Sequence, residues 1–476
     1  MSGGASGAGY NRSTAHLTRP AAQSIQDAVL RPFWTDDAAG PTSEPALRGA
    51  HRADLLVVGG GYTGLWTALQ AKELDPGLRV VVLEGNTVGS GASGRNGGFC
   101  EASLTHGEAN GELHFAAELP TLHRLGMENL DGIADTLRRY GLDAEFERTG
   151  QLAVATEPHQ LEWLATESGP AVTRLDAAEM RSSIDSPLYL GGEWSRHDTA
   201  MVHPAKLVWG LKQACLELGV TIAEHSPARA LRREGERMVV QTPHGSVEAA
   251  RVALGTNAFP ALLARARPYV IAVYDYVLMT EPLSDAQLAS IGWSGRQGVG
   301  DLANQFHYYR LSADNRILWG GYDAIYHYGG RVNRAHEDRP ATFQKLAEQF
   351  LLTFPQLEGI RFTHRWGGAI DTCTRFAPFF GTAHGGRVAY TAGFTGLGVG
   401  SSRWAARVLI DLLSGEQTEL TELGMVRSKP IPWPAEPLTY PLVELTRRSL
   451  NRADARGGRR NLLLRAMDAA GVGFAS

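Results

Sequence analysis

The segment that most constrains the fold is a short apolar run followed by a glycine-rich turn near the N-terminus. Residues 55–58 are Leu-Leu-Val-Val, and residues 59–64 read Gly-Gly-Gly-Tyr-Thr-Gly, a G-x-G-x-x-G pattern. A continuous apolar run is typical of a strand buried on both faces of a parallel sheet. A helical pattern follows from Tyr62 to a turn at 75–77, and a second buried strand covers 80–83. The sequence therefore predicts one complete β-α-β unit.

This unit carries the features of a dinucleotide-binding site. Gly59 permits a tight turn, Gly61 lets the backbone approach a pyrophosphate, and Gly64 lets the helix pack closely on the strand. Glu84 follows the second strand, where its carboxylate can accept hydrogen bonds from a ribose. A carboxylate there would repel a 2′-phosphate, so it disfavours NADP but leaves NAD and FAD open. The cofactor contacts predicted in this unit are Gly59, Gly61, Tyr62, Thr63, Gly64 and Glu84.

Two further glycine-rich segments favour FAD over NAD. Residues 89–98 contain five glycines in ten positions, and such backbone can lie flat against a planar ring. Residues 393–400 lead into an amphipathic helix at 401–413, whose N-terminus would stabilise negative charge on a reduced flavin. The alternatives are a flexible surface loop for the first segment and a packing turn for the second. The cofactor contacts predicted outside the first unit are Ala92, Ser93, Arg95, Asn96, Gly97, Gly98, Gly255, Gly396, Leu397 and Gly398.

Size and charge exclude several classes of function. A chain of 476 residues predicts two domains. The formal net charge of −4 gives no indication of binding to nucleic acid or to an anionic membrane surface. No run of 18 apolar residues and no signal-peptide pattern occurs, so we expect a cytoplasmic protein without a membrane span. Three cysteines without a CxxC pair exclude a disulfide framework, and no metal site is predicted.

Taken together, these motifs identify a resemblance to a known family. The sequence resembles the glycine/D-amino-acid oxidase superfamily of FAD-dependent amine oxidoreductases, and most of all its γ-glutamylputrescine oxidase-like branch. The likeness rests on residues 53–65, 91–98 and 393–400, with support from Trp366-Gly-Gly and His203-Pro204. It extends over most of the chain.

The resemblance implies an α/β fold in which a Rossmann-type FAD-binding domain is interwoven with a mixed-sheet, α+β substrate domain. We therefore expect an N-terminal arm at 1–50, lying across the surface, and a C-terminal tail at 421–476. The FAD-binding domain is expected to comprise 51–115, 201–258 and 373–420. The substrate domain is expected to comprise 116–200 and 259–372.

The resemblance also implies the reaction. A hydride passes from the carbon beside an amine to flavin N5, the imine hydrolyses to an aldehyde or keto acid, and the reduced flavin usually passes its electrons to oxygen. A dehydrogenase that uses a quinone or carrier protein, an amino-acid oxidase, and a flavin-binding protein without turnover are the competing readings. The partners expected are therefore a small amine and an electron acceptor, with a homo-oligomer left open.

Two departures from the family pattern bear on cofactor and substrate. Residues 95–98 contain no histidine and Cys373 lies several residues from the family's attachment cysteine, so we expect non-covalent FAD, with Cys100 the thiol nearest the loop. Amino-acid oxidases of the family often place an arginine shortly after the Trp366 position. Here residues 369–371 are Ala-Ile-Asp, and Arg375 or Arg310 would have to serve instead.

The candidate residues for the substrate pocket come from the predicted substrate domain. His307, Tyr309 and Trp366 lie on predicted strands and could form the wall of an amine pocket, while Asp371 could hold an ammonium group. Sheet packing for the aromatic residues and a turn or cap for Asp371 are the alternatives. A basic C-terminal segment could contact a partner, although a solvated helix face is favoured. Its arginines are Arg447, Arg448, Arg452, Arg456, Arg459 and Arg460.

Overall fold

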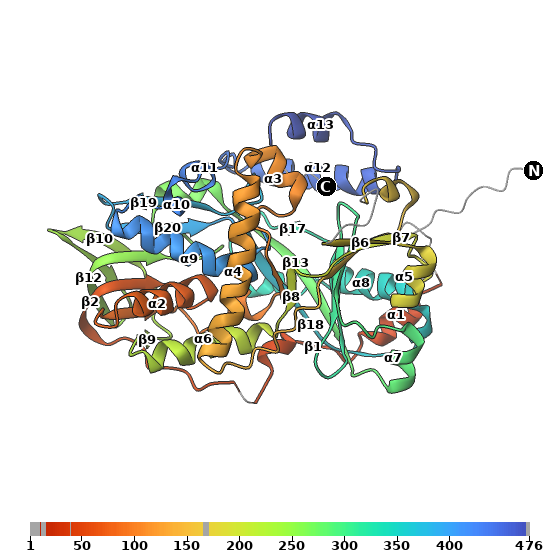
Figure 1. The fold of residues 1–476 in the computed structure, drawn as a ribbon, viewed down its shortest axis with the longest axis horizontal. Helices are drawn as coiled ribbons and strands as arrows, with labels where there is room; N and C mark the ends of the chain where they lie inside the picture. Colours follow the sequence, from red (N-terminus) through yellow and green to blue (C-terminus); the bar gives the residue numbers. More distant parts are fainter. Residues whose placement is uncertain (1–9, 11–15, 39, 165–170, 473–476) are drawn as a thin grey trace, which may run out of the picture.

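The protein folds into two lobes, each organised around a β-sheet (Figure 1). The computed structural model describes residues 10, 16–38, 40–164 and 171–472. One sheet has eight strands and contains the predicted β-α-β unit, and the other has ten strands. A two-stranded sheet of β4 (Phe99–Glu101) and β8 (Thr199–Met201) lies between them. The α/β fold class predicted from the sequence is confirmed.

The eight-stranded sheet forms the nucleotide lobe. Five of its strands run in the order β9-β3-β2-β12-β20, with β9 at one edge, and all of these pairings are parallel. The strand predicted at 55–58 begins earlier, because β2 pairs with β12 along its whole length. The strands of this sheet are β2 (Gly49–Val58), β3 (Val80–Leu83), β9 (Thr221–Ala223), β10 (Ala230–Glu234), β11 (Arg237–Gln241), β12 (Gly245–Leu254), β19 (Phe379–Ala383) and β20 (Val388–Ala392).

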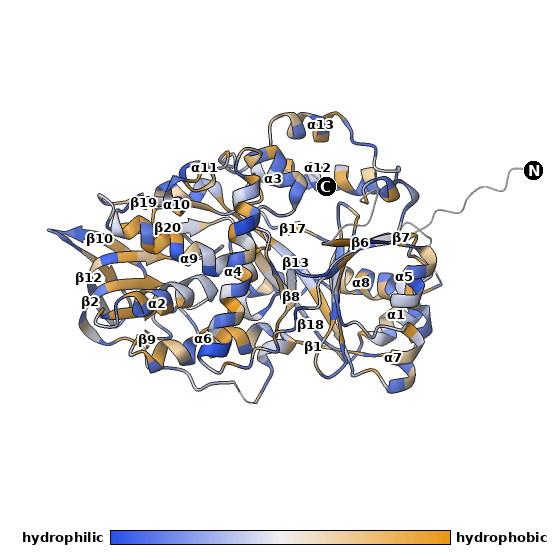
Figure 2. Ribbon diagram, in the orientation of Figure 1, coloured by the Kyte–Doolittle hydropathy of each residue, from blue (hydrophilic) through white to orange (hydrophobic). Residues whose placement is uncertain are grey.

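Four helices pack together in the core of the nucleotide lobe. They are α2 (Tyr62–Leu74), α4 (Leu119–Arg139), α6 (Pro204–Glu217) and α9 (Gly398–Ser414). The strands beneath them are mostly apolar, while α4 alternates between polar and apolar faces (Figure 2). The apolar side of α4, including Leu122, Leu130 and Ile133, is buried in this core. This corrects the expectation that residues 116–200 belong as a block to the substrate domain, since α4 packs with the nucleotide lobe.

The ten-stranded sheet forms the second lobe, with α8 (Pro340–Thr353) in the core on one of its faces. Its order is β1-β18-β13-β16-β15-β14-β5-β7-β6, and β17 pairs with β13. The strands are β1 (Val29–Leu30), β5 (Gln151–Ala155), β6 (Val172–Asp176), β7 (Gly191–Ser195), β13 (Ile271–Thr280), β14 (Gly298–Asp301), β15 (His307–Leu311), β16 (Ile317–Gly321), β17 (Ile325–Tyr326) and β18 (Phe362–Thr372). The shorter helices are α3 (Glu108–Phe115), α5 (Ala177–Ser183), α7 (Asp285–Ile291), α10 (Glu419–Glu422) and α11 (Gly424–Arg427).

The N-terminal segment is not the surface arm expected from its composition. Helix α1 (Thr18–Ser24) packs against α8, with Leu17, Ala21 and Ile25 buried at helical spacing. Strand β1 then pairs in parallel with β18. Trp34 follows with 0% exposure, and its indole N–H donates to the Asn96 carbonyl at 2.9 Å. Residues 17–35 are therefore part of the substrate lobe. The apolar residues of 17–25 have the spacing of a buried helix, and β1 joins the ten-stranded sheet through β18.

The C-terminal tail also folds back on the chain. Helix α12 (Thr439–Asp454) is followed by α13 (Leu462–Ala469), and both lie along the upper edge of the molecule in Figure 1. Asp454 accepts a hydrogen bond from the Asn304 backbone at 3.0 Å, and Arg447 pairs with Glu444 at 2.9 Å. Within the described residues, no helix is long and apolar enough to cross a membrane, and no cluster of potential metal ligands is present.

Replacing Trp34 with Phe should destabilise the protein. The substitution keeps an aromatic ring but leaves the Asn96 carbonyl without its donor, so we expect a loss of about 1–3 kcal/mol in the free energy of unfolding. Denaturant unfolding followed by tryptophan-independent circular dichroism measures this loss. The control is Trp163→Phe, whose side chain is 41% exposed and which should change stability by less than about 0.5 kcal/mol. Equal effects of the two substitutions would contradict the assignment.

Candidate cofactor and substrate site

The glycine-rich turn between β2 and α2 requires its glycines for backbone contact. Gly59 has φ +113°, and a Cβ there would lie 2.4 Å from the carbonyl oxygen of Gly255. A Cβ on Gly64 would lie 1.8 Å from the carbonyl oxygen of Gly59. The glycine-rich turn therefore contacts both the start of α2 and the residue after β12 through main-chain atoms alone.

This turn also presents unsatisfied N–H groups. The Tyr62 N–H donates to Ser93 Oγ at 3.0 Å. The N–H groups of Gly61 and Thr63 find no protein acceptor within the described part of the chain. A Cβ on Gly61 would lie 2.8 Å from Ser93 Oγ, so this space is closed to a side chain. Free N–H groups at the start of a helix suit a pyrophosphate, so the residues present fit the dinucleotide expected from the sequence.

Glu84 lies at the carboxyl end of β3 beside this turn. Its carboxylate accepts hydrogen bonds from the Gly60 N–H at 2.7 Å and the Asn86 N–H at 2.8 Å. Burial raises the pKa of Glu84 above its usual value, although these N–H groups partly offset that rise. The structure thus brings Glu84, the turn and Ser93 together, as a ribose and pyrophosphate would require.

The loop at 89–98 is held from the other lobe through its carbonyl groups. The Trp366 indole N–H donates to the Arg95 carbonyl at 2.9 Å, and Trp34 donates to the next carbonyl, that of Asn96. The buried Arg310 guanidinium donates to the carbonyls of Val202 at 2.6 Å and Gly98 at 3.4 Å. Three side chains of the substrate lobe therefore fix three carbonyls of one glycine-rich loop, those of residues 95, 96 and 98.

Side chains within the loop complete this arrangement. Asn96 Nδ2 donates to the Ala92 carbonyl at 3.1 Å, and its Oδ1 accepts from the Gly98 N–H at 2.8 Å. Arg95 pairs with Glu337 at 2.7 Å. Arg95 and Asn96, which the sequence suggested as cofactor contacts, thus hold the loop in shape through their side chains.

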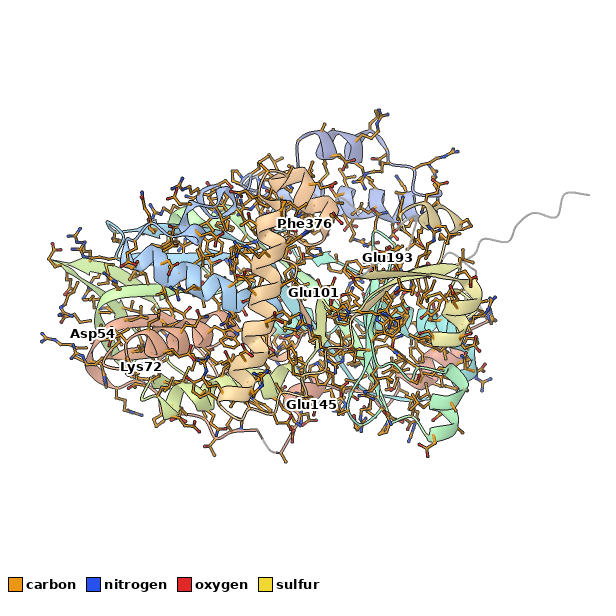
Figure 3. All side chains as sticks on the ribbon, viewed as in Figure 1. Asp54, Lys72, Glu101, Glu145, Glu193 and Phe376 are labelled. Atoms are coloured by element: carbon orange, nitrogen blue, oxygen red, sulfur yellow. The ribbon has the colours of Figure 1, made fainter. Side chains whose placement is uncertain are left out.

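The segment before α9 forms a second backbone cradle. Thr395 has φ +50° and Gly396 has φ +101°, and a Cβ on Gly400 would lie 2.0 Å from the carbonyl oxygen of Glu101. Glu101, labelled in Figure 3, lies on β4 between the two lobes. The N–H groups of Gly398 and Val399 find no acceptor in the part of the chain that the structure describes. The start of α9, which includes Gly398, is thus held against β4 with free donors.

Asp371 braces this cradle, contrary to the expectation that it faces a substrate amine. It is 1% exposed, and its carboxylate accepts hydrogen bonds from the N–H groups of Gly393 at 2.7 Å and Phe394 at 3.2 Å. Burial raises the pKa of Asp371 to about 7. The structural alternative, a turn or cap, therefore describes this residue as a turn contact, because its carboxylate is occupied by the backbone N–H groups of the segment that leads into α9.

Two of the aromatic candidates lie on the opposite face of the sheet from the glycine-rich loop. His307 and Tyr309 are both fully buried in the core that contains α8, and His307 bonds Asp301 at 2.7 Å and Gln349 at 3.0 Å. Alternation along β15 turns Tyr308 and Arg310 toward the loop instead. This corrects the prediction that His307 and Tyr309 form the wall of the amine pocket, because side chains alternate along β15 and these two point away from the loop.

The residues that the sequence analysis missed lie on the loop-facing side of the same sheet. The ring of Tyr308 would lie 2.6 Å from a Cβ on Gly97, and its hydroxyl group donates to Asp275 Oδ2. Gly368, the register partner of Asp275 on β18, lies below Arg95. Gly320 on β16 is the register partner of Tyr308, and Gly368 on β18 is the register partner of Asp275, so these two glycines were the available signal for this side of the sheet.

None of the arginines suggested for a substrate carboxylate is free to bind one. Arg375 donates to the carbonyls of Pro378 at 2.5 Å and Met425 at 2.9 Å, and Arg310 bonds the carbonyls described above. Burial lowers the pKa of both guanidinium groups to about 10. Ile370 lies on the same face of β18 as Trp366.

Replacing Glu84 with Ala should weaken cofactor binding. The change removes a charged acceptor worth about 1.5–3 kcal/mol, so the affinity for FAD should fall by roughly ten- to a hundred-fold. Fluorescence titration of the flavin-free protein with FAD gives the dissociation constant. Asp54→Ala is the control, because Asp54 forms an exposed ion pair with Arg79 at 2.8 Å on the same β-α-β unit and should leave the affinity unchanged. Unaltered affinity in Glu84→Ala would refute the role of this carboxylate.

Comparisons with known proteins agree with this site. The family described as "FAD dependent oxidoreductase", the DAO family, matches residues 54–412. The chain is 31% identical over 395 residues to the gamma-glutamylputrescine oxidoreductase of Escherichia coli, covering 80% of this chain and 88% of that protein. It is 27% identical to the probable oxidoreductase OrdL of Haemophilus influenzae, over 82% of this chain and 90% of that protein.

Solved structures show the same fold. Glycine oxidase from Geobacillus kaustophilus superposes with a TM-score of 0.65 at 20% identity, covering 79% of this chain and 99% of that chain. Iminodiacetate oxidase from Chelativorans gives a TM-score of 0.64 at 18% identity, over 80% of this chain and all of that chain. With its glycine cradle, its acid after β3 and a family match over most of its length, this chain belongs to the DAO family of FAD-dependent oxidoreductases.

Proposed function

We propose that the protein oxidises a C–N bond of an amine whose reacting end carries no α-carboxylate, and that oxygen reoxidises the flavin. The observation that carries the substrate class is the engagement of Arg95, Arg310 and Arg375 by protein acceptors. A substrate carboxylate buried without a cationic partner would lose several kcal/mol of binding. The side of the sheet that faces the loop therefore favours an amine over an α-amino acid.

The names of the relatives support this choice in part. The gamma-glutamylputrescine oxidoreductase is the relative with 31% identity, and its name describes a substrate with an amine end. Glycine oxidase and iminodiacetate oxidase, by contrast, have names that describe amino acids or their derivatives, and they share only the fold at 20% and 18% identity. The competing function is thus an amino-acid oxidase, which would need a carboxylate anchor other than these arginines.

Each part of the site has a defined role in this proposal. The start of α2 and Glu84 hold the pyrophosphate and the adenosine ribose, and the loop at 89–98 supports the flavin ring. Donors at the start of α9 favour negative charge on the reduced ring. When bound, FAD supplies the acceptor for the hydride that leaves the carbon beside the nitrogen. The cofactor residues proposed from the sequence outside the β-α-β unit, including Gly255 and Leu397, border these same cradles.

Non-covalent attachment of FAD is expected from the environment of the thiols. Cys100 is fully buried and burial raises its pKa to about 12, so it stays protonated. Cys373 is fully buried and donates to the carbonyls of Ala377 at 3.2 Å and Gly393 at 3.3 Å. Acid precipitation of the yellow protein should release intact FAD into the supernatant, identified by chromatography. Flavin that remains in the pellet would disprove non-covalent binding.

The substrate class can be tested by anaerobic flavin reduction. Polyamines, acylated diamines and monoamines should bleach the flavin faster than glycine, sarcosine or D-amino acids. The rate should rise with pH until the bound amine is neutral, since an ammonium has no lone pair to assist hydride loss. Oxygen consumption with the same amines distinguishes an oxidase from a dehydrogenase that uses a quinone or carrier. Faster reduction by a free α-amino acid than by every amine would reverse the assignment, and no reduction by any compound would favour a binding protein without turnover.

A further inference from the structure

The central strands of the ten-stranded sheet are buried except at one point. In β13, nine of ten residues are buried and Asp275 alone is partly exposed. In β15, four of five residues are buried and Tyr308 alone is partly exposed. These two residues contact each other, because the Tyr308 hydroxyl group donates to Asp275 Oδ2. Partial exposure at a single point in the middle of a sheet means that solvent reaches this pair.

The Tyr308–Asp275 pair lies on the side of the sheet that faces the glycine-rich loop. The Tyr308 ring occupies the space beside Gly97, and a Cβ on Gly320 would lie 2.6 Å from the same ring. On the other side of Asp275, its register partner Gly368 carries no side chain, and a Cβ there would lie 3.7 Å from Arg95 Cβ. Glycine therefore leaves open the space between Asp275 and the loop that is expected to support the flavin ring.

Asp275 forms no ion pair with any residue that the structure describes. Within the described residues, no lysine, arginine or histidine nitrogen lies within 4 Å of its carboxylate, and Arg95, the cation on the neighbouring loop, is paired with Glu337. Burial raises the pKa of Asp275 to about 6, while the Tyr308 hydroxyl group and nearby backbone N–H groups oppose that rise. A partly buried carboxylate without a counter-ion is unfavourable, and a cationic ligand would compensate it.

We propose that Asp275 is the recognition site for the ammonium group of the substrate, with Tyr308 as the positioning residue that orients its carboxylate. The inference rests on the proposed amine oxidation and names the residue that would select the substrate. The loop-facing side of the ten-stranded sheet offers no free arginine for a substrate carboxylate, but it carries the Asp275 carboxylate, which could bind an ammonium group. An incoming alkylammonium ion would donate a charge-assisted hydrogen bond to Asp275 between the sheet and the loop, and it must then lose a proton to solvent before the carbon beside it gives up a hydride. An α-amino acid would bring a second carboxylate close to Asp275, and repulsion would oppose its binding.

The test measures binding without turnover. tert-Butylammonium has no hydrogen on the carbon that carries nitrogen, so it cannot reduce the flavin, and tert-butanol is its neutral isostere. Binding of each probe to the flavin-loaded protein is followed by the change in flavin absorbance at pH 8. The wild-type protein should bind the ammonium ion about 10- to 100-fold more tightly than the alcohol, and Asp275→Asn should abolish that preference. The Tyr308→Phe variant should lower the preference by up to about threefold without abolishing it, because Asp275 keeps its charge but loses the hydroxyl group that orients its carboxylate.

Asp314→Asn is the matched control, because it removes the same charge at the turn between β15 and β16, where Asp314 pairs with Arg316 at 2.7 Å. It should retain the preference for the ammonium ion. If Asp275→Asn loses its flavin, Asp275→Ala replaces it, since it removes the carboxylate without adding atoms. A preference that survives in both Asp275 variants, or no preference in the wild type, would overturn the assignment. If no amine reduces the flavin but the protein still prefers the ammonium ion to the alcohol, the proposed amine oxidation is refuted, while the assignment of Asp275 as an ammonium-binding residue stands.

Discussion

The structure depends on the hydrogen bonds that hold the glycine-rich loop between the two lobes. Trp366, Trp34 and Arg310 come from distant parts of the chain and donate to carbonyl groups of the same loop. A loop with five glycines has a high conformational entropy in isolation, so it needs external donors to hold one shape. Because these donors belong to the substrate lobe, the surface that faces the flavin forms only when the two lobes are in contact.

Close main-chain contacts fix the rest of the cofactor site. Gly59 meets Gly255, Gly64 meets Gly59, and Gly400 meets Glu101, each at a distance that leaves no space for a Cβ. These contacts place the starts of α2 and α9, two helices that pack against each other, with their free N–H groups on the cofactor side. Phosphate and reduced flavin are both anionic, so these helix starts would stabilise both ends of the proposed cofactor site by the same means.

Charge distribution separates the two faces of the ten-stranded sheet. On the core face, His307 and Asp301 satisfy each other beneath α8. On the loop face, the arginines are used by carbonyl groups or by Glu337, and Asp275 is left without a cation. Under the proposed function, a site with this balance would discriminate by electrostatic complementarity and favour a positively charged ligand over a zwitterion with an α-carboxylate.

The sequence alone determined the β-α-β unit, the role of its glycines and the acid after β3, because these depend on short-range spacing and on backbone geometry. It also identified the family, and with it the α/β fold and FAD. Tertiary structure decided which side chains of β15 face the loop. Neighbouring residues of a strand point to opposite faces, so the choice of face decides whether Tyr308 or Tyr309 lies beside the loop. It likewise decided that Trp34 lies in the core and that Asp371 braces α9, because their partners, Asn96 and Gly393, are distant in sequence and meet them only after the lobes assemble.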